Sequence, residues 1–242
     1  TEEGFSIVSL SPQLWLDASD AATITENGGA VSQWSDKSGN GNHAIQASTS
    51  LRPLTASQTI NTFNTLKFDG SNDRLQNSSL VVGQPNTVFG VVKDNITGTS
   101  FRTWWSGSSG ASRSFLSHSS TRNLWAGTGI TNGTPTTNPE IWGGEYNGTS
   151  STLYVDGIAG SSGNAGTNLI NGYWIGEESG SSKPNWNGLI GEIIVFNTVL
   201  NEADRQKIEG YLAHKWGLAA NLPASHPYKS SPPSSDLDGD GI

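Results

Sequence analysis

The chain has 242 residues with a formal net charge of -8, and it contains 30 Gly but no Cys and no Met. The negative charge argues against a nucleic-acid partner, whose phosphates need a basic face, and against an anionic membrane surface. No apolar run reaches the length of a membrane span, so we expect no membrane insertion.

The length suits one large β-sandwich better than two ordinary domains. Abundant Gly, Ser, Thr and Asn supply the turns that an all-β fold needs. A Pro-Ser cluster at 230–235 has the composition of a linker. We therefore predict one domain over residues 1–229, followed by a linker and tail over residues 230–242.

Short strands are predicted throughout the first third of the chain. Residues 1–13 are a lead-in in which Phe5, Ile7 and Val8 can form an edge strand, although Pro12 limits pairing there. Strands are expected at 14–16, at 30–34 after the turn at 27–29, near 43–46, and at 65–68 paired with 73–76 around a turn at Asp69.

The middle of the chain has the strand spacing of an antiparallel sandwich. Residues 127–138 are expected to form a long polar loop. The strands are predicted at 86–93, 100–105, 114–118, 123–126, 140–146, 151–155, 173–176 and 189–196.

One helix is predicted near the C-terminus. Asn201 can cap it, with Asp204 three residues later. Residues 208, 211, 212 and 216 place apolar and aromatic side chains on one face, and Gly217 ends the helix.

Five segments carry a resemblance to a known superfamily: LWLDASD at 14–20, WSDKSGNGNHA at 34–44, LKFDGSNDRL at 66–75, EYNGTSSTLYVDG at 145–157, and the strand-and-helix region at 173–216. In these the chain resembles the laminin-G-like jelly rolls of the concanavalin A-like lectin and glucanase superfamily, in the form found in secreted bacterial proteins. The resemblance implies an all-β, two-sheet antiparallel jelly-roll sandwich with one C-terminal helix. It does not fix the function, because the fold hosts lectins, adhesion modules, hydrolases and lyases.

Two places could hold calcium. Asp236, Asp238 and Asp240, followed by Gly241, have the one-three-five-Gly spacing of a calcium loop, and the tail resembles the start of a thrombospondin type 3 or dockerin-like repeat. The alternative is an acidic tail that binds calcium weakly or not at all. Relatives in the superfamily hold a calcium at the sandwich rim, which makes ligands of Asp69, Asn72 and Asp73; the alternative is that these side chains build the turn.

Catalytic signatures of the superfamily are missing. Its hydrolases place Glu and Asp alternately on one strand, as E-x-D-x-E, whereas the one Glu-x-Asp of this chain, Glu202 to Asp204, falls in the predicted helix and not on a strand. Glu192 stands alone in its strand, and the Gln-Ile-His strand of the lyases is absent. The four His residues have no metal-ligand spacing. We therefore expect no enzymatic activity.

Aromatic residues are the remaining signal, because sugars stack on Trp and Tyr. In the strand at 100–105, Trp104 and Trp105 are expected to point to opposite faces, so that one packs inside and the other projects. The predicted sugar-binding group is Arg102, Trp104, Trp105, His118, Arg122 and Trp125, while the Trp residues at 15, 34, 174, 186 and 216 are assigned to the core.

These features favour a non-catalytic carbohydrate-binding module of a larger secreted or cell-surface bacterial protein, either a polysaccharide-degrading enzyme or an adhesin. The expected partners are a glycan or polysaccharide, with a neutral glycan favoured, and the other domains of a multidomain parent. A protein-protein adhesion or spacer module is one alternative. A polysaccharide hydrolase or lyase with an unfamiliar site is the other.

Overall fold

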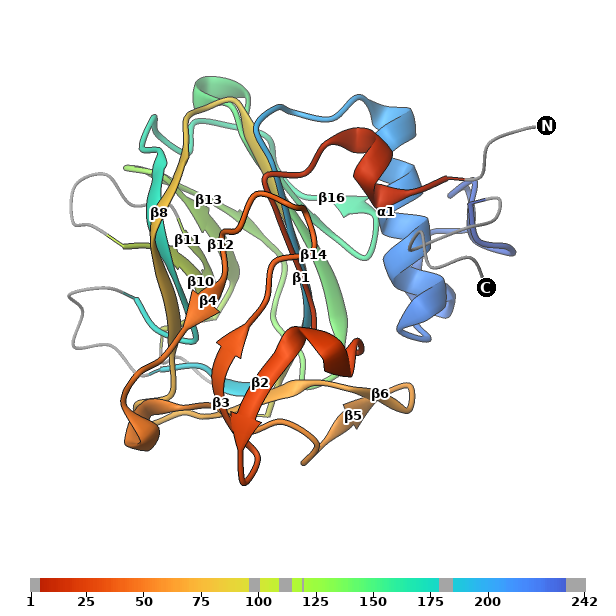
Figure 1. The fold of residues 1–242 in the computed structure, drawn as a ribbon. Helices are drawn as coiled ribbons and strands as arrows, with labels where there is room; N and C mark the ends of the chain where they lie inside the picture. Colours follow the sequence, from red (N-terminus) through yellow and green to blue (C-terminus); the bar gives the residue numbers. More distant parts are fainter. Residues whose placement is uncertain (1–4, 96–100, 109–114, 119, 179–184, 234–242) are drawn as a thin grey trace.

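The computed structural model describes residues 5–95, 101–108, 115–118, 120–178 and 185–233. Two antiparallel sheets pack face to face, and the one α-helix of this described part, α1 (Glu202–Lys215), lies on the outer face of one of them (Figure 1). The predicted all-β sandwich with a single C-terminal helix is confirmed.

The first sheet has seven strands in the order β1-β18-β9-β14-β15-β16, with β7 also pairing β18. We call it the seven-stranded sheet. Its strands are β1 (Leu14–Asp17), β7 (Leu66–Asp69), β9 (Asn86–Asp94), β14 (Glu140–Tyr146), β15 (Thr152–Val155), β16 (Ile158–Ala159) and β18 (Asn187–Phe196).

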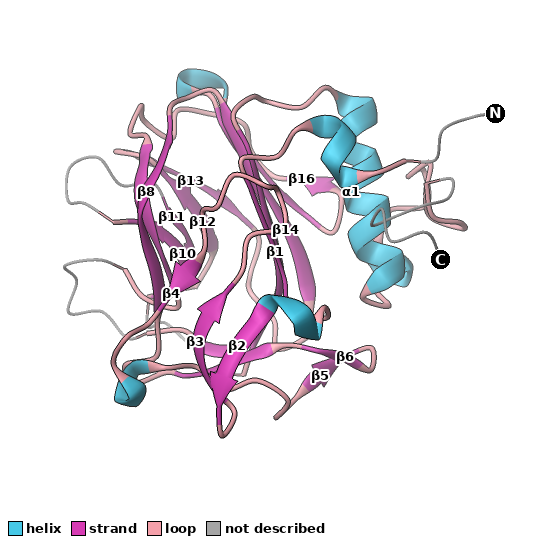
Figure 2. Ribbon diagram, in the orientation of Figure 1, coloured by secondary structure: helices cyan, strands magenta, loops and turns pink. Residues whose placement is uncertain are grey.

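The second sheet has nine strands in the order β13-β12-β11-β10-β17-β8-β4-β3-β2, and we call it the nine-stranded sheet. Its strands are β2 (Ile24–Asn27), β3 (Ala30–Trp34), β4 (Ala44–Ile45), β8 (Leu75–Val82), β10 (Arg102–Gly107), β11 (Phe115–His118), β12 (Arg122–Trp125), β13 (Gly129–Asn132) and β17 (Ile170–Ile175). A separate hairpin consists of β5 (Thr59–Ile60) and β6 (Phe63–Asn64), and Figure 2 separates all these strands from the loops by colour.

Side-chain alternation along the strands divides the apolar residues into two cores. On β18, Ile193 and Val195 join the core between the sheets, whereas Ile194 and Phe196 join the core between the seven-stranded sheet and α1. The seven-stranded sheet is thus buried on both faces. This explains why β18 has a nearly continuous apolar sequence.

The helix begins and ends where its sequence predicts. Asn201 caps it by accepting a hydrogen bond from the Asp204 amide at 2.9 Å, and Gly217 follows the last turn with φ of +71°. Its apolar face packs on the seven-stranded sheet. Close approach is possible because a Cβ at Gly191 of β18 would lie 2.7 Å from the Trp216 ring.

Three local predictions are wrong. The expected edge strand at Phe5, Ile7 and Val8 is a 3-10 turn at Ile7–Leu10, in which the Ser9 hydroxyl donates to the Ser6 carbonyl. Residues 65–68 and 73–76 do not pair, because β7 belongs to the seven-stranded sheet and β8 to the nine-stranded sheet. The chain crosses between sheets at this point. The expected loop at 127–138 contains β13, which pairs with β12.

The chain after the helix packs back onto α1. A Cβ at Gly210 would meet the Tyr228 side chain at 2.5 Å, and the His214 ring bonds the Tyr228 carbonyl at 2.8 Å. This interaction keeps the folded unit intact at least to Tyr228. The boundary at residue 229 remains a prediction, and residues 234–242 lie outside the described part.

Candidate functional site

The two adjacent Trp residues of β10 are buried, contrary to prediction. Trp104 and Trp105 both have no exposed surface and both belong to the core between the sheets. Trp104 packs edge-on against Trp142, and Trp105 stacks on Tyr173 with ring centroids 4.9 Å apart. Neither ring can stack on a sugar, so both are removed from the candidate site.

A β-bulge explains why neither Trp projects outward. The pairing of β10 with β11 shifts register between Thr103 and Trp105, which inserts one residue and breaks the alternation. Gly90 of β9 supplies the space, because a Cβ there would lie 2.4 Å from the Trp104 ring. The strict two-residue period that predicted one outward Trp therefore fails at this position.

The two arginines that were predicted to bind sugar instead form ion pairs between the two sheets. Arg122 of β12 donates to Glu140 of β14 through Nε at 2.7 Å and through a second nitrogen at 2.5 Å, and both side chains are buried. Arg102 of β10 reaches Asp94 of β9 at 3.2 Å. Each pair joins opposite sheets, so these charges face the interior. His118 lies on β11 beside both arginines in register, but its side chain lies outside the described residues.

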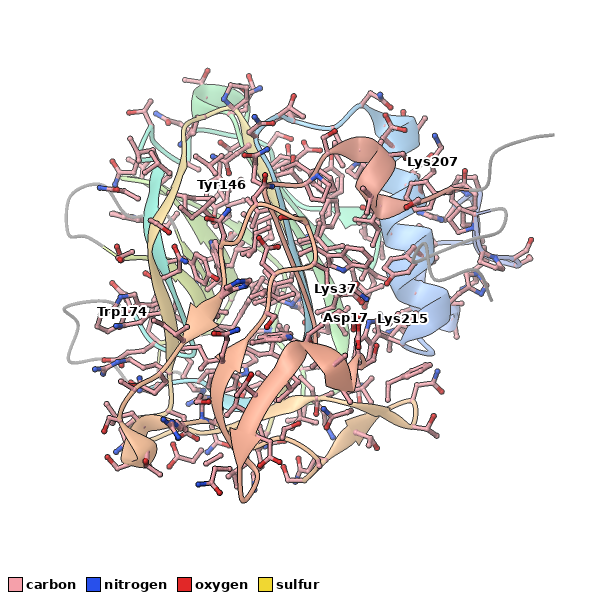
Figure 3. The ribbon with its side chains drawn as sticks, in the orientation of Figure 1. Asp17, Lys37, Tyr146, Trp174, Lys207 and Lys215 are labelled. Atoms are coloured by element: carbon pink, nitrogen blue, oxygen red, sulfur yellow. The ribbon has the colours of Figure 1, made fainter. Side chains whose placement is uncertain are left out.

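The Trp residues that keep exposed surface lie on the outer face of the nine-stranded sheet. Seven of the nine Trp are at most 1 % exposed, which leaves two, Trp125 and Trp174. Both are half-buried. Their strand neighbours Leu124, Tyr173 and Ile175 point into the core, so by alternation both indoles point away from it. Figure 3 places Trp174 on the side of the molecule opposite α1.

Strand pairing aligns these two residues in a single row. Trp125 pairs with Phe115, Phe115 with Ser106, and Ser106 with Trp174. The row continues across β8, β4 and β3 through Gln76, Ile45 and Gln33. We call these residues the outer row. Side chains at paired positions share a face of the sheet, so Trp125, Ser106, Trp174, Gln76, Ile45 and Gln33 belong to one surface that runs across the strands.

The guanidinium of Arg74 packs on the Trp174 ring. It lies 4.7 Å from the indole centroid, and it pairs with Glu177 at 2.9 Å. The charge of Arg74 is therefore compensated within the site. Sequence analysis assigned Trp174 to the core, although its position between two inward residues is a signal that could have found it. Arg74 lies 100 residues earlier in the chain, and no sequence pattern predicts that it packs on Trp174.

The predicted rim ligands form a hydrogen-bonded turn. Asp69 Oδ1 accepts hydrogen bonds from the Ser71 and Asn72 amides, and Asp73 Oδ2 accepts from the Asp69 amide at 2.9 Å. Three carboxylate or amide side chains are fewer than the six to eight oxygens that calcium takes. The geometry agrees with the turn interpretation, and calcium at this rim stays a prediction. Asp236, Asp238 and Asp240 lie outside the described residues.

Glu192, the lone carboxylate of β18, is buried between the sheet and α1. It has no exposed surface, and it accepts hydrogen bonds from both the Trp15 and Trp216 indoles at 2.8 Å and from Tyr211 at 2.9 Å. Lys215 Nζ lies 3.1 Å from it. Burial raises the pKa of Glu192, against the opposing effect of Lys215. Because Glu192 is enclosed by these groups, its role in the described structure is to bind the side chains between β18 and α1.

Lys215 also pairs with Asp17 of β1, at 2.8 Å (Figure 3). Burial alone would raise the pKa of Asp17, but the charge and hydrogen bond of Lys215 hold it below its ordinary value. The same two carboxylates raise the pKa of Lys215 despite its burial. The buried cluster of Asp17, Glu192 and Lys215 thus fastens the end of α1 to the sandwich.

No group of three or more His, Cys, Asp or Glu side chains among the described residues is arranged to hold a metal ion. None of the helices in this part of the chain has the length and apolar character needed to cross a membrane.

The sequence matches no protein-family model and no curated protein. The fold, in contrast, is similar to several solved structures. A Trypanosoma rangeli sialidase in complex with sialic acid is 14% identical with a TM-score of 0.58, over 84% of this chain and 33% of that one. This chain therefore spans about a third of the sialidase.

Two further structures match at the same level. Domain 4 of AbnA, an extracellular GH43 arabinanase of Geobacillus stearothermophilus in complex with arabinotriose, is 15% identical with a TM-score of 0.59, over 80% of this chain and 95% of that domain. The binding domain of Paraclostridial Mosquitocidal Protein 1 is 11% identical with a TM-score of 0.58, over 84% and 52% of the two chains. At these identities the matches establish a shared β-sandwich fold.

Proposed function

We propose that this domain is a non-catalytic carbohydrate-binding module of a larger secreted bacterial protein, and that it binds its glycan on the outer row. One observation carries the proposal: the only two Trp rings with exposed surface, Trp125 and Trp174, stand in one row on a sheet face that α1 does not cover. Exposed aromatic rings provide the apolar platforms on which sugar rings stack.

The polar surroundings of the two rings suit the same ligand. Asn123 lies two residues before Trp125 on the same face and is half-buried, and Gln76 pairs with Trp174 across the strands. Amide groups both donate and accept hydrogen bonds, as sugar hydroxyls require. One of the fold relatives, the arabinanase domain, was solved with arabinotriose, which supports including arabinan among the first glycans tested.

The absence of catalysis is part of the proposal. Superfamily hydrolases need two carboxylates on one strand face, and the one carboxylate of β18 is enclosed by Trp15, Trp216 and Tyr211. Assays for reducing sugar and for unsaturated products on plant and marine polysaccharides should stay at background. Turnover that survives repurification would favour the hydrolase or lyase alternative.

A glycan array with and without calcium, followed by calorimetry on the hits, tests the binding function. We expect saturable binding to at least one glycan family, weakened by Trp125→Ala and by Trp174→Ala. Val81→Ala is the matched control, because Val81 is an exposed apolar residue of the same sheet, on β8 but outside the row. Failure to bind across a broad array, together with tight binding to a protein, would favour the adhesion alternative.

Variants that bind like the parent would move the site elsewhere. The strongest other location among the described residues is a depression of about 570 Å³ near the β2 edge, whose lining includes Ile24, Glu26, Gln58 and Thr62.

A further inference from the structure

The spacing of the two exposed indoles defines the size of ligand that the row can hold. Trp125 lies on β12 and Trp174 on β17, and β11 and β10 run between them. The two residues are therefore three strand spacings apart, about 14 Å. A single sugar ring covers one indole, so only a chain of sugars can contact both.

Two residues of the outer row lie between the two indoles, Phe115 on β11 and Ser106 on β10. Ser106 pairs directly with Trp174, its side chain is buried, and its hydroxyl donates to the Gly107 carbonyl at 2.8 Å. A buried Ser offers a ligand little contact. The contact area at this end of the row is thus concentrated on Trp174 and on the residues beyond it, Gln76 and Ile45, the latter 49% exposed.

The described residues place little net charge along the row. The outer row contains no charged residue from Trp125 to Gln33, and the neighbouring Arg74 is neutralised by Glu177 at 2.9 Å. A sulfated or uronic-acid chain would have to give up water around its charges without gaining a partner here. A neutral chain has no such cost.

From this spacing and neutrality, and resting on the proposed function, we infer that the ligand is a neutral linear glycan chain, laid across the strands so that separate sugar units contact Trp125 and Trp174. The two rings then act as linked subsites. Occupying the second becomes an intramolecular step once the first is occupied, so affinity depends on chain length.

Calorimetry with neutral oligosaccharide series of one to six units, made from the array hits, tests this inference. Arabino-, xylo-, manno- and gluco-oligosaccharides are the probes. For the parent protein we expect affinity to rise at least tenfold between one unit and the length that spans both rings, and then to level off. Raising the salt concentration should leave it unchanged.

The variants separate this inference from the proposed function. Trp125→Ala and Trp174→Ala should each remove the gain with chain length, so that long chains bind about as weakly as short ones bind the parent, while Val81→Ala keeps the gain. Binding that is equal for one and six units, or Trp effects that do not depend on ligand length, would overturn the two-subsite inference while leaving a glycan-binding module intact. Absence of binding for every series and polysaccharide would overturn the proposed function itself.

Discussion

The two outer faces of this sandwich use tryptophan in opposite ways. On the seven-stranded sheet, α1 covers Trp15 and its own neighbour Trp216, and both indole N–H groups donate to the buried Glu192. On the nine-stranded sheet, Trp125 and Trp174 keep part of their surface open. The first pair holds α1 against the sheet, and the second pair keeps ring surface exposed on the opposite face.

The difference lies in what covers each face. Trp and Tyr are costly to bury unless their polar atoms find a partner, and the helix side supplies one in Glu192 and balances its charge with Lys215. Among the described residues no helix covers the nine-stranded sheet, and Trp125 and Trp174 keep exposed surface there. Four experiments test this contrast between the two faces.

The largest effect should come from the interior. Trp104→Ala should lower the free energy of unfolding by about 3–5 kcal/mol, because the ring is fully buried between the sheets and leaves a cavity against Trp142. Urea unfolding followed by far-UV circular dichroism measures it. Val81→Ala, at a position 63% exposed, should change stability by less than about 0.5 kcal/mol. A Trp104 variant as stable as the parent would mean that this ring is not core.

Stability should depend almost as strongly on the buried cluster of Asp17, Glu192 and Lys215. Lys215→Met leaves Glu192 buried without its cation and leaves Asp17 with only Lys37, 3.4 Å away, so it should cost roughly 3 kcal/mol or more. Lys207→Met removes a more exposed pair with Asp204 and should cost less than about 1 kcal/mol. Thermal unfolding of both variants at neutral pH gives the comparison. Equal losses would contradict the assignment of the buried cluster to holding α1.

The free energy of unfolding should depend on pH through Asp156, in the seven-stranded sheet. Burial raises the pKa of Asp156, in the turn from β15 to β16, to about 6 from an ordinary 3.8. The folded state thus binds the proton more tightly, and this group makes the protein less stable as pH rises from about 4 to 6. Asp156→Asn keeps an acceptor for the Ile141 amide and should stabilise by on the order of 2 kcal/mol at pH 7.

At pH 3.5, where the parent carboxyl is protonated in both states, the Asp156→Asn variant and the parent should match in stability. Denaturant unfolding at the two pH values provides the check. A stabilisation of the same size at both would show that the charge of Asp156 is not its source.

The smallest free-energy change should appear in binding. Trp125→Ala and Trp174→Ala should each weaken glycan affinity about tenfold, or about 1.4 kcal/mol, while the melting temperature moves little because both rings are half-buried. Calorimetry and thermal unfolding on the same samples separate the two quantities. Either variant failing to fold would place that ring in the core.

Sequence patterns predicted the fold well and the site only in part. Continuous apolar residues predicted the doubly buried β18, and the cap at Asn201 predicted the start of α1. The resemblance supplied the two-sheet arrangement. These features depend on local composition or on a short capping motif, which a sequence records directly.

The site depends on which face each residue meets, and that is decided by distant contacts. The sequence gives no sign of the bulge at Trp104, which exists because Gly90 makes room for the ring. Arginine is usually exposed, so the sequence favours exposed positions for Arg102 and Arg122. Both are buried because they pair with carboxylates of the opposite sheet, Asp94 and Glu140. Trp125 belongs both to the predicted group and to the proposed site, whereas Trp174 enters the proposed site through its strand pairing.

Indole N–H resonances in a two-dimensional ¹H–¹⁵N NMR spectrum test the central claim most directly, because the nine Trp give nine separate probes spread over both faces and the core. Single Trp→Phe variants assign them. During titration with an oligosaccharide that the array identifies, the account predicts that the Trp125 and Trp174 signals shift first and furthest, while those of Trp15 and Trp216 stay in place. Shifts centred on Trp15 and Trp216, with Trp125 and Trp174 unmoved, would contradict it.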